Sequence, residues 1–379
     1  MSEVDGAGHP DVQPPLDWPG APGSARPRLA GSPAWQAGLK QSPESFRVDE
    51  ELGFDPSGAG NHWLMRLEKR DMTTGALVDW IAKVTGTRAR DIGFSGLKDR
   101  HAVTTQWLSV PHESFDPAAF ERACAEAGVG LLALDRHDRK LRRGTHRANR
   151  FRLRLHDVAP VHETEAPDLA GYLAERAPGL ASRGMANYFG EQRYGRYFGN
   201  LRGLVEWGQG IRTGRPKRQA RNWLLSTLRS AIFDRVLADR VASGGIDRVE
   251  PGDLLQLAGS RSRFLAEADE LDVLEARLAQ GDVMPTGPLW GEGASPAGDG
   301  VAARENALAT EMLARFGEAT WRQWLSDWRV EADRRPLAVR VTDLEYGVED
   351  GAVELAFSLP PGSYATELVA ELFTVTSSD

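Results

Sequence analysis

One acidic side chain in the run GFSGLKDRHAVTTQW, residues 93–107, has neighbours that suit it to catalysis. Asp99 lies between Lys98 and Arg100 in a short polar turn with apolar, strand-like segments on both sides. Neighbouring cations favour the charged form of a carboxylate, and an ionised carboxylate can act as a covalent or an acid–base group. Either Lys98 or Arg100 is therefore expected to hold Asp99 ionised, although the spacing alone is more typical of a structural ion pair.

A second segment, residues 136–154, is strongly basic, with nine Lys or Arg residues and the single acid Asp138. Such a concentration of charge is typical of a phosphate-binding surface. The segment ends in a strand-like alternation that contains Phe151. This ring could stack on a nucleobase, which stabilises a complex by roughly 1–3 kcal/mol per base, or it could belong to the core of a strand. The RNA contacts expected from this segment are Arg139, Lys140, Arg142 and Arg143.

The chain as a whole is acidic, with a formal net charge of -8 over 379 residues. Any RNA site must therefore be a local basic face on an acidic body. A further basic run, RTGRPKRQAR at residues 212–221, carries five cations and no acid. Its expected RNA contacts are Arg215, Lys217 and Arg218.

The turn around Asp99 resembles the catalytic motif of the TruD family of tRNA pseudouridine synthases, GxKD[RK]HAVT, in which the Asp is catalytic. Four separate motifs of that family occur in the expected order. Asn149 and Phe151 match a GNxF motif in which Ala148 replaces the Gly, and residues 187–195 match NYFGxQRFG. Near the C-terminus, LPPGSYAT matches LPxGS[YF]AT, so the resemblance covers nearly the whole chain from about residue 40 to 373.

The resemblance implies roles for individual residues. Asp99 is the catalytic group, and Phe151 stacks on the target uracil. Support of the active site is expected from Lys98, Arg100, Lys40, Phe46 and Asn149. In the NYFGxQRFG motif, amide and guanidinium groups among flat aromatic rings suit contacts to non-helical RNA, which are expected from Asn187, Gln192 and Arg193.

The implied activity is the isomerisation of uridine to pseudouridine at position 13 of a subset of tRNAs. The bond from N1 to the ribose breaks and C5 joins the same sugar carbon, which needs no cofactor. A metal site is not expected, because the chain has no HExxH motif and one cysteine, Cys124, which reads as a small core residue on a helix. With no apolar run of about 20 residues, the protein is expected to be cytoplasmic, with tRNA and no obligate protein as its partner.

The elements that must position these residues alternate between strands and helices. Strands are expected at residues 46–50 and 62–67, followed by a helix that Thr74 caps and Gly86 ends. The fold class is therefore α+β, that is, mixed α/β. The resemblance implies a pseudouridine synthase catalytic domain with a mixed, largely antiparallel sheet and an inserted α/β TRUD-type domain.

The domain boundaries follow from the composition and the family layout. The first 43 residues contain eight Pro and no periodic apolar pattern, so residues 1–43 are expected to be a disordered arm. The catalytic domain is expected at residues 44–183 and 338–379, and the inserted domain at 184–337.

Two other classes of function remain open. A noncatalytic RNA-binding or RNA-chaperone protein could use the same basic groove, but it has no need of an acid in a turn that faces phosphate. A glycosidase-like hydrolase would normally show a pair of carboxylates, and the turn contains one acid, Asp99.

Overall fold

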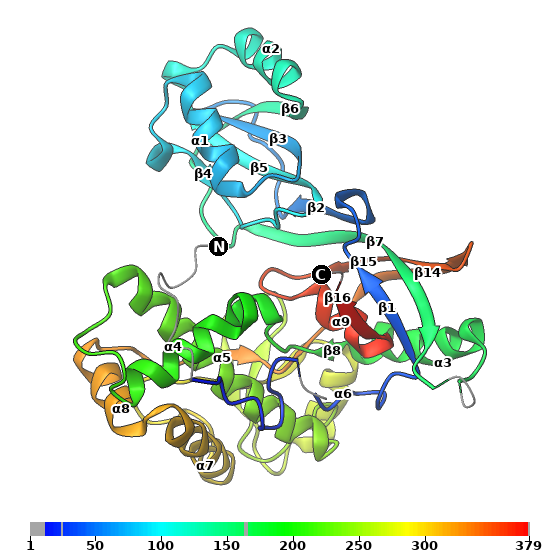
Figure 1. Ribbon diagram of the computed structural model, residues 1–379, viewed down its shortest axis with the longest axis vertical. Helices are drawn as coiled ribbons and strands as arrows, with labels where there is room; N and C mark the ends of the chain where they lie inside the picture. Colours follow the sequence, from blue (N-terminus) through cyan, green and yellow to red (C-terminus); the bar gives the residue numbers. More distant parts are fainter. Residues whose placement is uncertain (1–11, 24–25, 163–165, 378–379) are drawn as a thin grey trace. The chain divides into compact units, whose positions relative to one another are not determined.

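The computed structural model describes residues 12–23, 26–162 and 166–377, which fall into two compact units (Figure 1). The sheet unit consists of Pro33–Ala181, Val341–Ala365 and Leu372–Asp379. The helical unit consists of Met1–Ser32, Ser182–Arg340 and Thr366–Glu371. Each unit is assembled from segments that are far apart in the sequence.

The sheet unit is built on a ten-stranded sheet with the central order β14-β15-β7-β2-β5-β3-β6. Most neighbouring strands are antiparallel, whereas β2 with β5 and β1 with β16 are parallel. This confirms the prediction of a mixed, largely antiparallel sheet in a mixed α/β protein. The strands are β1 (Trp35–Leu39), β2 (Phe46–Leu52), β3 (His62–Arg70), β4 (Gly93–Phe94), β5 (Val103–Pro111), β6 (Gly130–His137), β7 (His146–Pro160), β14 (Thr342–Glu349), β15 (Ala352–Leu359) and β16 (Thr374–Ser377).

Three helices accompany these strands, namely α1 (Thr74–Thr85), α2 (Pro117–Ala127) and α3 (Leu169–Arg183). The side chain of Thr73, and not that of Thr74 as expected, caps α1 by accepting a hydrogen bond from Ala76 N at 3.1 Å. Thr74 instead accepts a hydrogen bond from the backbone N–H of Lys98 at 2.9 Å. Gly86 ends the helix in the left-handed conformation, with φ 71°, as predicted.

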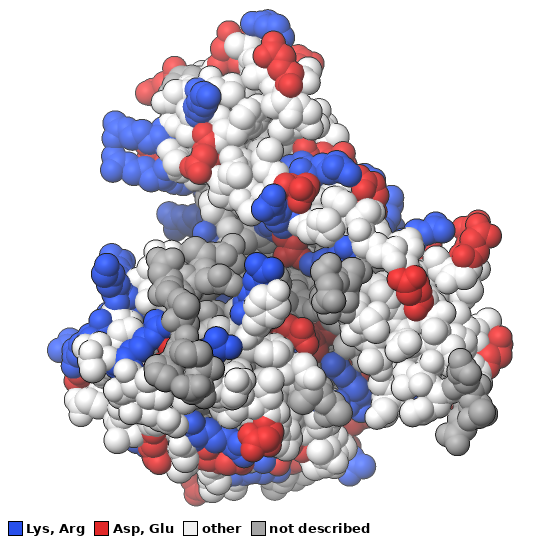
Figure 2. All heavy atoms as spheres, viewed as in Figure 1, with Lys and Arg blue, Asp and Glu red and all other residues white. Residues whose placement is uncertain are grey.

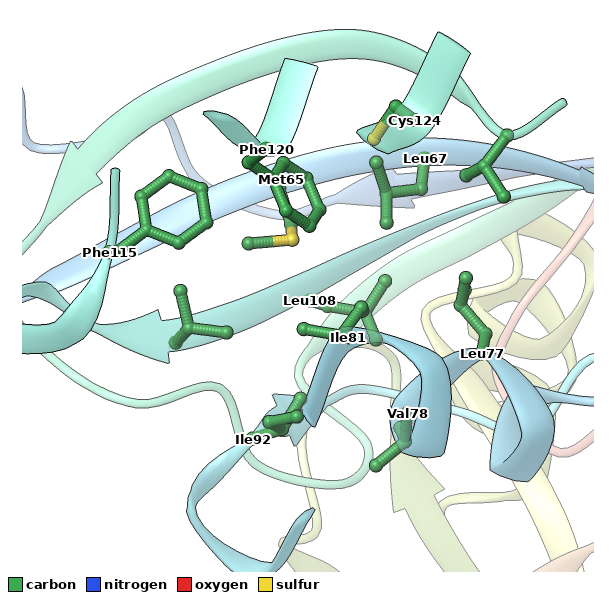
Figure 3. Close-up of a cluster of buried hydrophobic side chains, with 12 residues drawn as sticks. Met65, Leu67, Leu77, Val78, Ile81, Ile92, Leu108, Phe115, Phe120 and Cys124 are labelled. Atoms are coloured by element: carbon green, nitrogen blue, oxygen red, sulfur yellow. The ribbon is translucent and has the colours of Figure 1, made fainter. Parts of the chain in front are cut away.

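The apolar faces of α1 and α2 form one core with β3 and β5 (Figure 3). Cys124 lies in this core with 2% of its surface exposed, which confirms its prediction as a core residue. Burial raises the pKa of its thiol to about 11. The labelled side chains that meet here include Met65, Leu67, Leu77, Ile81, Leu108 and Phe120.

The helical unit contains a four-stranded sheet with the order β10-β9-β11-β12 and a two-stranded pair, β8 with β13. Its longest helix, α5, buries apolar side chains along its whole length, among them Leu224, Ile232 and Leu237. The helices are α4 (Gly199–Gly208), α5 (Arg218–Ala242), α6 (Leu271–Gln280), α7 (Asp299–Phe316), α8 (Glu318–Asp327) and α9 (Ala365–Leu372). The strands are β8 (Met185–Ala186), β9 (Leu254–Leu257), β10 (Arg263–Leu265), β11 (Val283–Leu289), β12 (Asp333–Pro336) and β13 (Ala338–Val339). Short 3-10 turns are η1 (Pro43–Ser45), η2 (Ala89–Asp91), η3 (His112–Ser114), η4 (Glu191–Tyr194) and η5 (Arg196–Phe198).

The predicted disordered arm has a defined structure over residues 12–23 and 26–43, so the prediction was wrong there; residues 1–11 and 24–25 lie outside the described residues. Trp18 is buried, with 2% of its surface exposed. Arg26 is also buried and donates hydrogen bonds to Glu367 at 2.9 Å and to Asp234 at 3.2 Å. Order in this segment comes from partners that lie hundreds of residues away, which local composition does not reveal.

None of the helices in the described ranges combines the length and the apolar character that a bilayer-spanning helix requires. The same residues contain no group of three or more His, Cys, Asp or Glu side chains arranged to hold a metal ion.

Candidate active site

The carboxylate of Asp99 lies on the turn between β4 and β5 and forms an ion pair with Lys40. The Nζ atom of Lys40 is 2.6 Å from Oδ2 of Asp99, and the two side chains are 26% and 31% exposed. Lys40 directly follows β1 and has φ 64°, a left-handed conformation that is unfavourable for a residue with a side chain. Its ammonium group also lies 4.3 Å from the centre of the Phe46 ring. Lys40 thus lies beside Asp99, with the Phe46 ring against its ammonium group, and the role of both in supporting the active site stays a prediction.

Neither cation beside Asp99 in the sequence is its partner in the structure. Arg100 is exposed, and its Nε atom lies 3.6 Å from Oδ1 of Asp71. The expectation that Lys98 or Arg100 holds the Asp99 carboxylate is therefore wrong. Successive residues of a turn point in different directions, and the position beside Asp99 is filled by Lys40 from a distant segment.

Lys98 is instead part of a buried network beneath the turn. Its Nζ atom is 2.6 Å from Oε2 of Glu50 and donates a hydrogen bond to Oδ1 of Asn149 at 2.6 Å. Glu50 and Asn149 are paired in register across β2 and β7. His146 lies 3.3 Å from the Asn149 amide, and burial together with the charge of Lys98 lowers its pKa. Glu50 and Asn149 therefore anchor the turn that carries Asp99 through Lys98, and their support of the active site stays a prediction.

Lys69 also fixes the turn, and the sequence analysis missed it. Its Nζ atom donates hydrogen bonds to the backbone carbonyls of Asp99, at 3.0 Å, and of Met72. Burial lowers the pKa of Lys69 to about 8, and the charge of Lys98 acts in the same direction while that of Asp99 opposes it. A signal was present in the sequence, because Lys69 continues the inward alternation of Met65 and Leu67 along β3.

The ring of Phe151 lies in the core of the sheet, with 7% of its surface exposed. It stacks on Phe357 with ring centres 5.2 Å apart and meets the edge of Phe46 at 6.2 Å. This placement agrees with the alternative of a core strand aromatic. The stacking of Phe151 on a uracil stays a prediction.

The basic segment between β6 and β7 exposes most of its cations. Arg139, Arg142 and Arg143 are exposed, and the guanidinium group of Arg143 lies 4.6 Å from the centre of the Phe94 ring. Lys140 donates a hydrogen bond to the carbonyl of Arg90 at 2.6 Å and so holds the chain in place. This surface remains available to phosphate groups.

The three RNA contacts predicted in the NYFGxQRFG match differ in how far they are buried. Asn187 is buried, with 3% exposed; its amide donates to the carbonyl of Pro336 at 2.8 Å, and its side-chain oxygen accepts from Arg335. The prediction that Asn187 contacts RNA is therefore wrong, because its polar atoms serve the fold. Arg193 is half-buried and donates to Ser226 at 2.7 Å, whereas Gln192 is exposed.

The basic run before α5 is also largely exposed. Arg215 forms an ion pair with Asp327, and Lys217 and Arg218 are exposed. On the face shown in Figure 2, basic and acidic side chains are interspersed, and the blue Lys and Arg side chains occur in local groups. This distribution fits local basic surfaces on an acidic chain.

The sequence matches the family described as tRNA pseudouridine synthase D (TruD) over residues 25–203 and 216–372. It is 40% identical over 349 residues to the tRNA pseudouridine synthase D of Pseudomonas syringae pv. tomato, which covers 91% of this chain and 94% of that protein. The protein of the same name from Methylococcus capsulatus is 39% identical over 349 residues, 91% of this chain and 93% of that protein. The fold resembles a crystal structure from Methanosarcina mazei, described as tRNA pseudouridine synthase D (TruD), with a TM-score of 0.68, 19% identity and coverage of 91% and 95% of the two chains.

Proposed function

The chain belongs to the TruD family of tRNA pseudouridine synthases, and we propose that Asp99 is the group with which it isomerises uridine in tRNA. The proposal rests on the exposure and the fixed position of the Asp99 carboxylate. It is partly exposed, lies on a turn anchored by Lys69 and Lys98, and has the ammonium group of Lys40 at 2.6 Å. Such a carboxylate is fixed in position and still open to a substrate.

The second carboxylate at the site, Glu50, is unsuited to the same role. It is 1% exposed, one of its oxygens accepts a hydrogen bond from Trp107 N at 3.0 Å, and the other is 2.6 Å from Lys98. One oxygen is therefore bound to the backbone of β5, and the other is paired with Lys98 of the turn. Of these two carboxylates, Asp99 is the one that is exposed enough to reach a nucleotide.

The reaction moves one bond and one proton. The bond between N1 and C1′ breaks, the base turns, and C5 bonds to C1′; C5 then loses its proton and N1 gains one. Asp99 acts as the covalent or acid–base group in these steps. The target nucleotide must first leave the stacked RNA, at a cost of about a few kcal/mol.

The substrate position and the domain assignment belong to the same proposal. We assign the target to the uridine at position 13 of a subset of tRNAs and expect the protein to act in the cytoplasm, where it would meet tRNA. We assign the catalytic domain to residues 44–183 and 338–379 and the inserted domain to 184–337. The sheet unit, with Pro33–Ala181 and Val341–Ala365, supports most of this division, and because it begins at Pro33 we extend the catalytic domain back to Pro33, so that it includes Lys40.

The test is the release of tritium from tRNA labelled at C5 of uracil. We expect the wild-type protein to release tritium and Asp99→Asn to do so at least roughly 10³-fold more slowly, because removal of an essential catalytic group has effects of that size or more. Asp71→Asn is the matched control, since Asp71 is the neighbouring exposed acid that pairs with Arg100. It should keep wild-type activity.

Two results would count against the proposal. Equal tritium release by the wild type and Asp99→Asn would remove Asp99 from the reaction, and tRNA binding without any release by the wild type would support a noncatalytic RNA-binding protein. A transcript with cytidine at position 13 tests the substrate position, because it should lose the enzyme-dependent release.

A further inference from the structure

Tyr197 is the most exposed of the large hydrophobic side chains in the described residues, with 76% of its surface exposed. It belongs to η5, the short turn between η4 and the start of α4 in the helical unit. An isolated exposed aliphatic residue is common on proteins. A tyrosine exposed to this degree presents a flat aromatic face to solvent.

The backbone beneath this ring is held in an unfavourable conformation. Tyr197 has φ 50° and the next residue, Phe198, has φ 57°. The left-handed region suits glycine, whereas side chains in it clash with the backbone. Two successive non-glycine residues in this region persist only where the surrounding structure imposes them, and such positions concentrate at ligand sites.

Contacts within the helical unit impose the conformation. The Phe198 ring lies against Gly23, where an added Cβ would be 3.0 Å from Cζ of Phe198. The N–H of Phe198 donates to the carbonyl of Gly195 at 3.0 Å. Asn200 ties the same turn to η4 by donating to the carbonyl of Arg193 at 3.3 Å. Phe198 is thus directed into the unit, and Tyr197 is directed out of it.

A cation lies beside the exposed ring. The Cζ atom of Arg196 is 4.9 Å from the centre of the Tyr197 ring, and its Nη2 atom donates to the phenol oxygen at 3.2 Å. Gln192, which belongs to the preceding turn η4, is also exposed. An exposed aromatic ring next to a guanidinium group is the combination with which proteins bind unpaired bases and their phosphates.

We propose that Tyr197, with Arg196, forms a binding site for one unpaired nucleobase of the tRNA, separate from the uridine that reacts. The inference rests on the proposed function for the identity of the RNA. A protein partner fits the surface less well, because the charged guanidinium group of Arg196 lies beside the ring. Because the site takes no part in the chemistry, it contributes to tRNA affinity and leaves the rate at saturating tRNA unchanged.

The experiment measures the Kd for a tRNA transcript, Tm and kcat for the wild type, Tyr197→Phe, Tyr197→Ala and Tyr197→Gly. Tyr197→Ala should raise Kd roughly 5- to 150-fold, the range for loss of one stacked base, and Tyr197→Phe should bind like the wild type. Tyr197→Gly should weaken binding as Ala does while its Tm stays equal to or above that of the wild type, since glycine accepts the left-handed conformation. Tyr346→Ala is the control, because this tyrosine is also exposed, at 40%, but lies on β14 in the sheet unit.

A Kd for Tyr197→Ala equal to that of the wild type would overturn the proposal. A fall in Tm or kcat that accounts for the whole loss of binding would also overturn it, because the ring would then be structural. Since Kd is measured directly, a failure of the Asp99 assignment would appear in tritium release and leave these binding results intact.

Discussion

The Nζ atom of Lys40 lies 2.6 Å from Oδ2 of Asp99, although 59 residues separate the two in the sequence. The pair joins the end of β1 to the turn before β5, and it requires Lys40 to adopt a left-handed backbone with φ 64°. A strained backbone that delivers a charge to a carboxylate is typical of a functional site. The cation that supports the candidate catalytic acid is therefore provided by the fold, whereas the cations adjacent in the sequence have other partners.

Replacement of this cation should impair catalysis more than folding. We expect Lys40→Met to lower kcat roughly 10²- to 10³-fold, the effect of removing one preorganised electrostatic contact. Steady-state kinetics of tritium release would measure it. Lys83→Met, which removes an exposed lysine of α1, is the matched control and should keep wild-type kcat. A Lys40→Met enzyme with wild-type kcat would mean that the ion pair is only structural.

Lys69 should make the stability of the protein depend on pH in the alkaline range. Its pKa is lowered from 10.5 to about 8 in the folded protein, so the unfolded chain binds more protons between these two values. The contribution of Lys69 should therefore increase the free energy of unfolding as the pH rises through that window. Urea denaturation at several pH values would measure the free energy of unfolding of the wild type and of Lys69→Met. The value for the wild type should rise relative to that for Lys69→Met as the pH increases through this window. A difference that stays constant with pH would contradict the lowered pKa.

The ring of Phe151 should matter for stability because it is enclosed by Phe46 and Phe357. Phe151→Ala should lower the free energy of unfolding by about 3–5 kcal/mol, the range for buried Phe to Ala. Phe54→Ala removes a partly exposed ring, at 37%, and should cost much less. In the folded fraction of Phe151→Ala, a loss of activity that exceeds the loss of tRNA affinity would support the predicted stacking on the uracil. Equal losses of activity and affinity would instead indicate a folding or general binding role for Phe151.

The buried charges around Arg26 should be costly to separate. Burial raises the pKa of Asp234 to about 7, and Arg26 opposes this shift. Arg26→Met would leave Asp234 and Glu367 without this buried cation, and we expect a loss of about 3–5 kcal/mol in the free energy of unfolding. Addition of Asp234→Asn should recover part of the loss. Full additivity of the two changes would show that the groups are not coupled.

Binding of tRNA should weaken steeply as salt concentration rises. Each phosphate contact contributes about one unit to the slope of log K against log salt, so the double variant Arg142→Gln, Arg143→Gln should reduce the slope by about 1–2. Arg277→Gln is the control, because this arginine is paired with Asp282 at 2.7 Å. A slope that is the same in the double variant and the wild type would exclude this segment from the RNA-binding surface.

Local sequence signals determined the elements and the candidate acid. The alternation in β2 and β3, the glycine that ends α1 and the core position of Cys124 depend on periodicity and on backbone conformation within a few residues. Asp99 was identified through the resemblance of a continuous run of residues to the catalytic motif of the family.

The tertiary structure alone decided which side chains meet. Arg26 and Glu367 form an ion pair across 341 residues, which gave order to a segment whose composition indicated disorder. Asn187 became a buried structural amide because Pro336 and Arg335 surround it. Such partners depend on how distant strands and helices are packed, and no local pattern encodes that packing. The sequence by itself therefore determined the family, the elements and the candidate acid, and it named Lys40 among the expected supporting residues. The packing of distant segments determined that Lys40, and not Lys98 or Arg100, is the cation beside that acid.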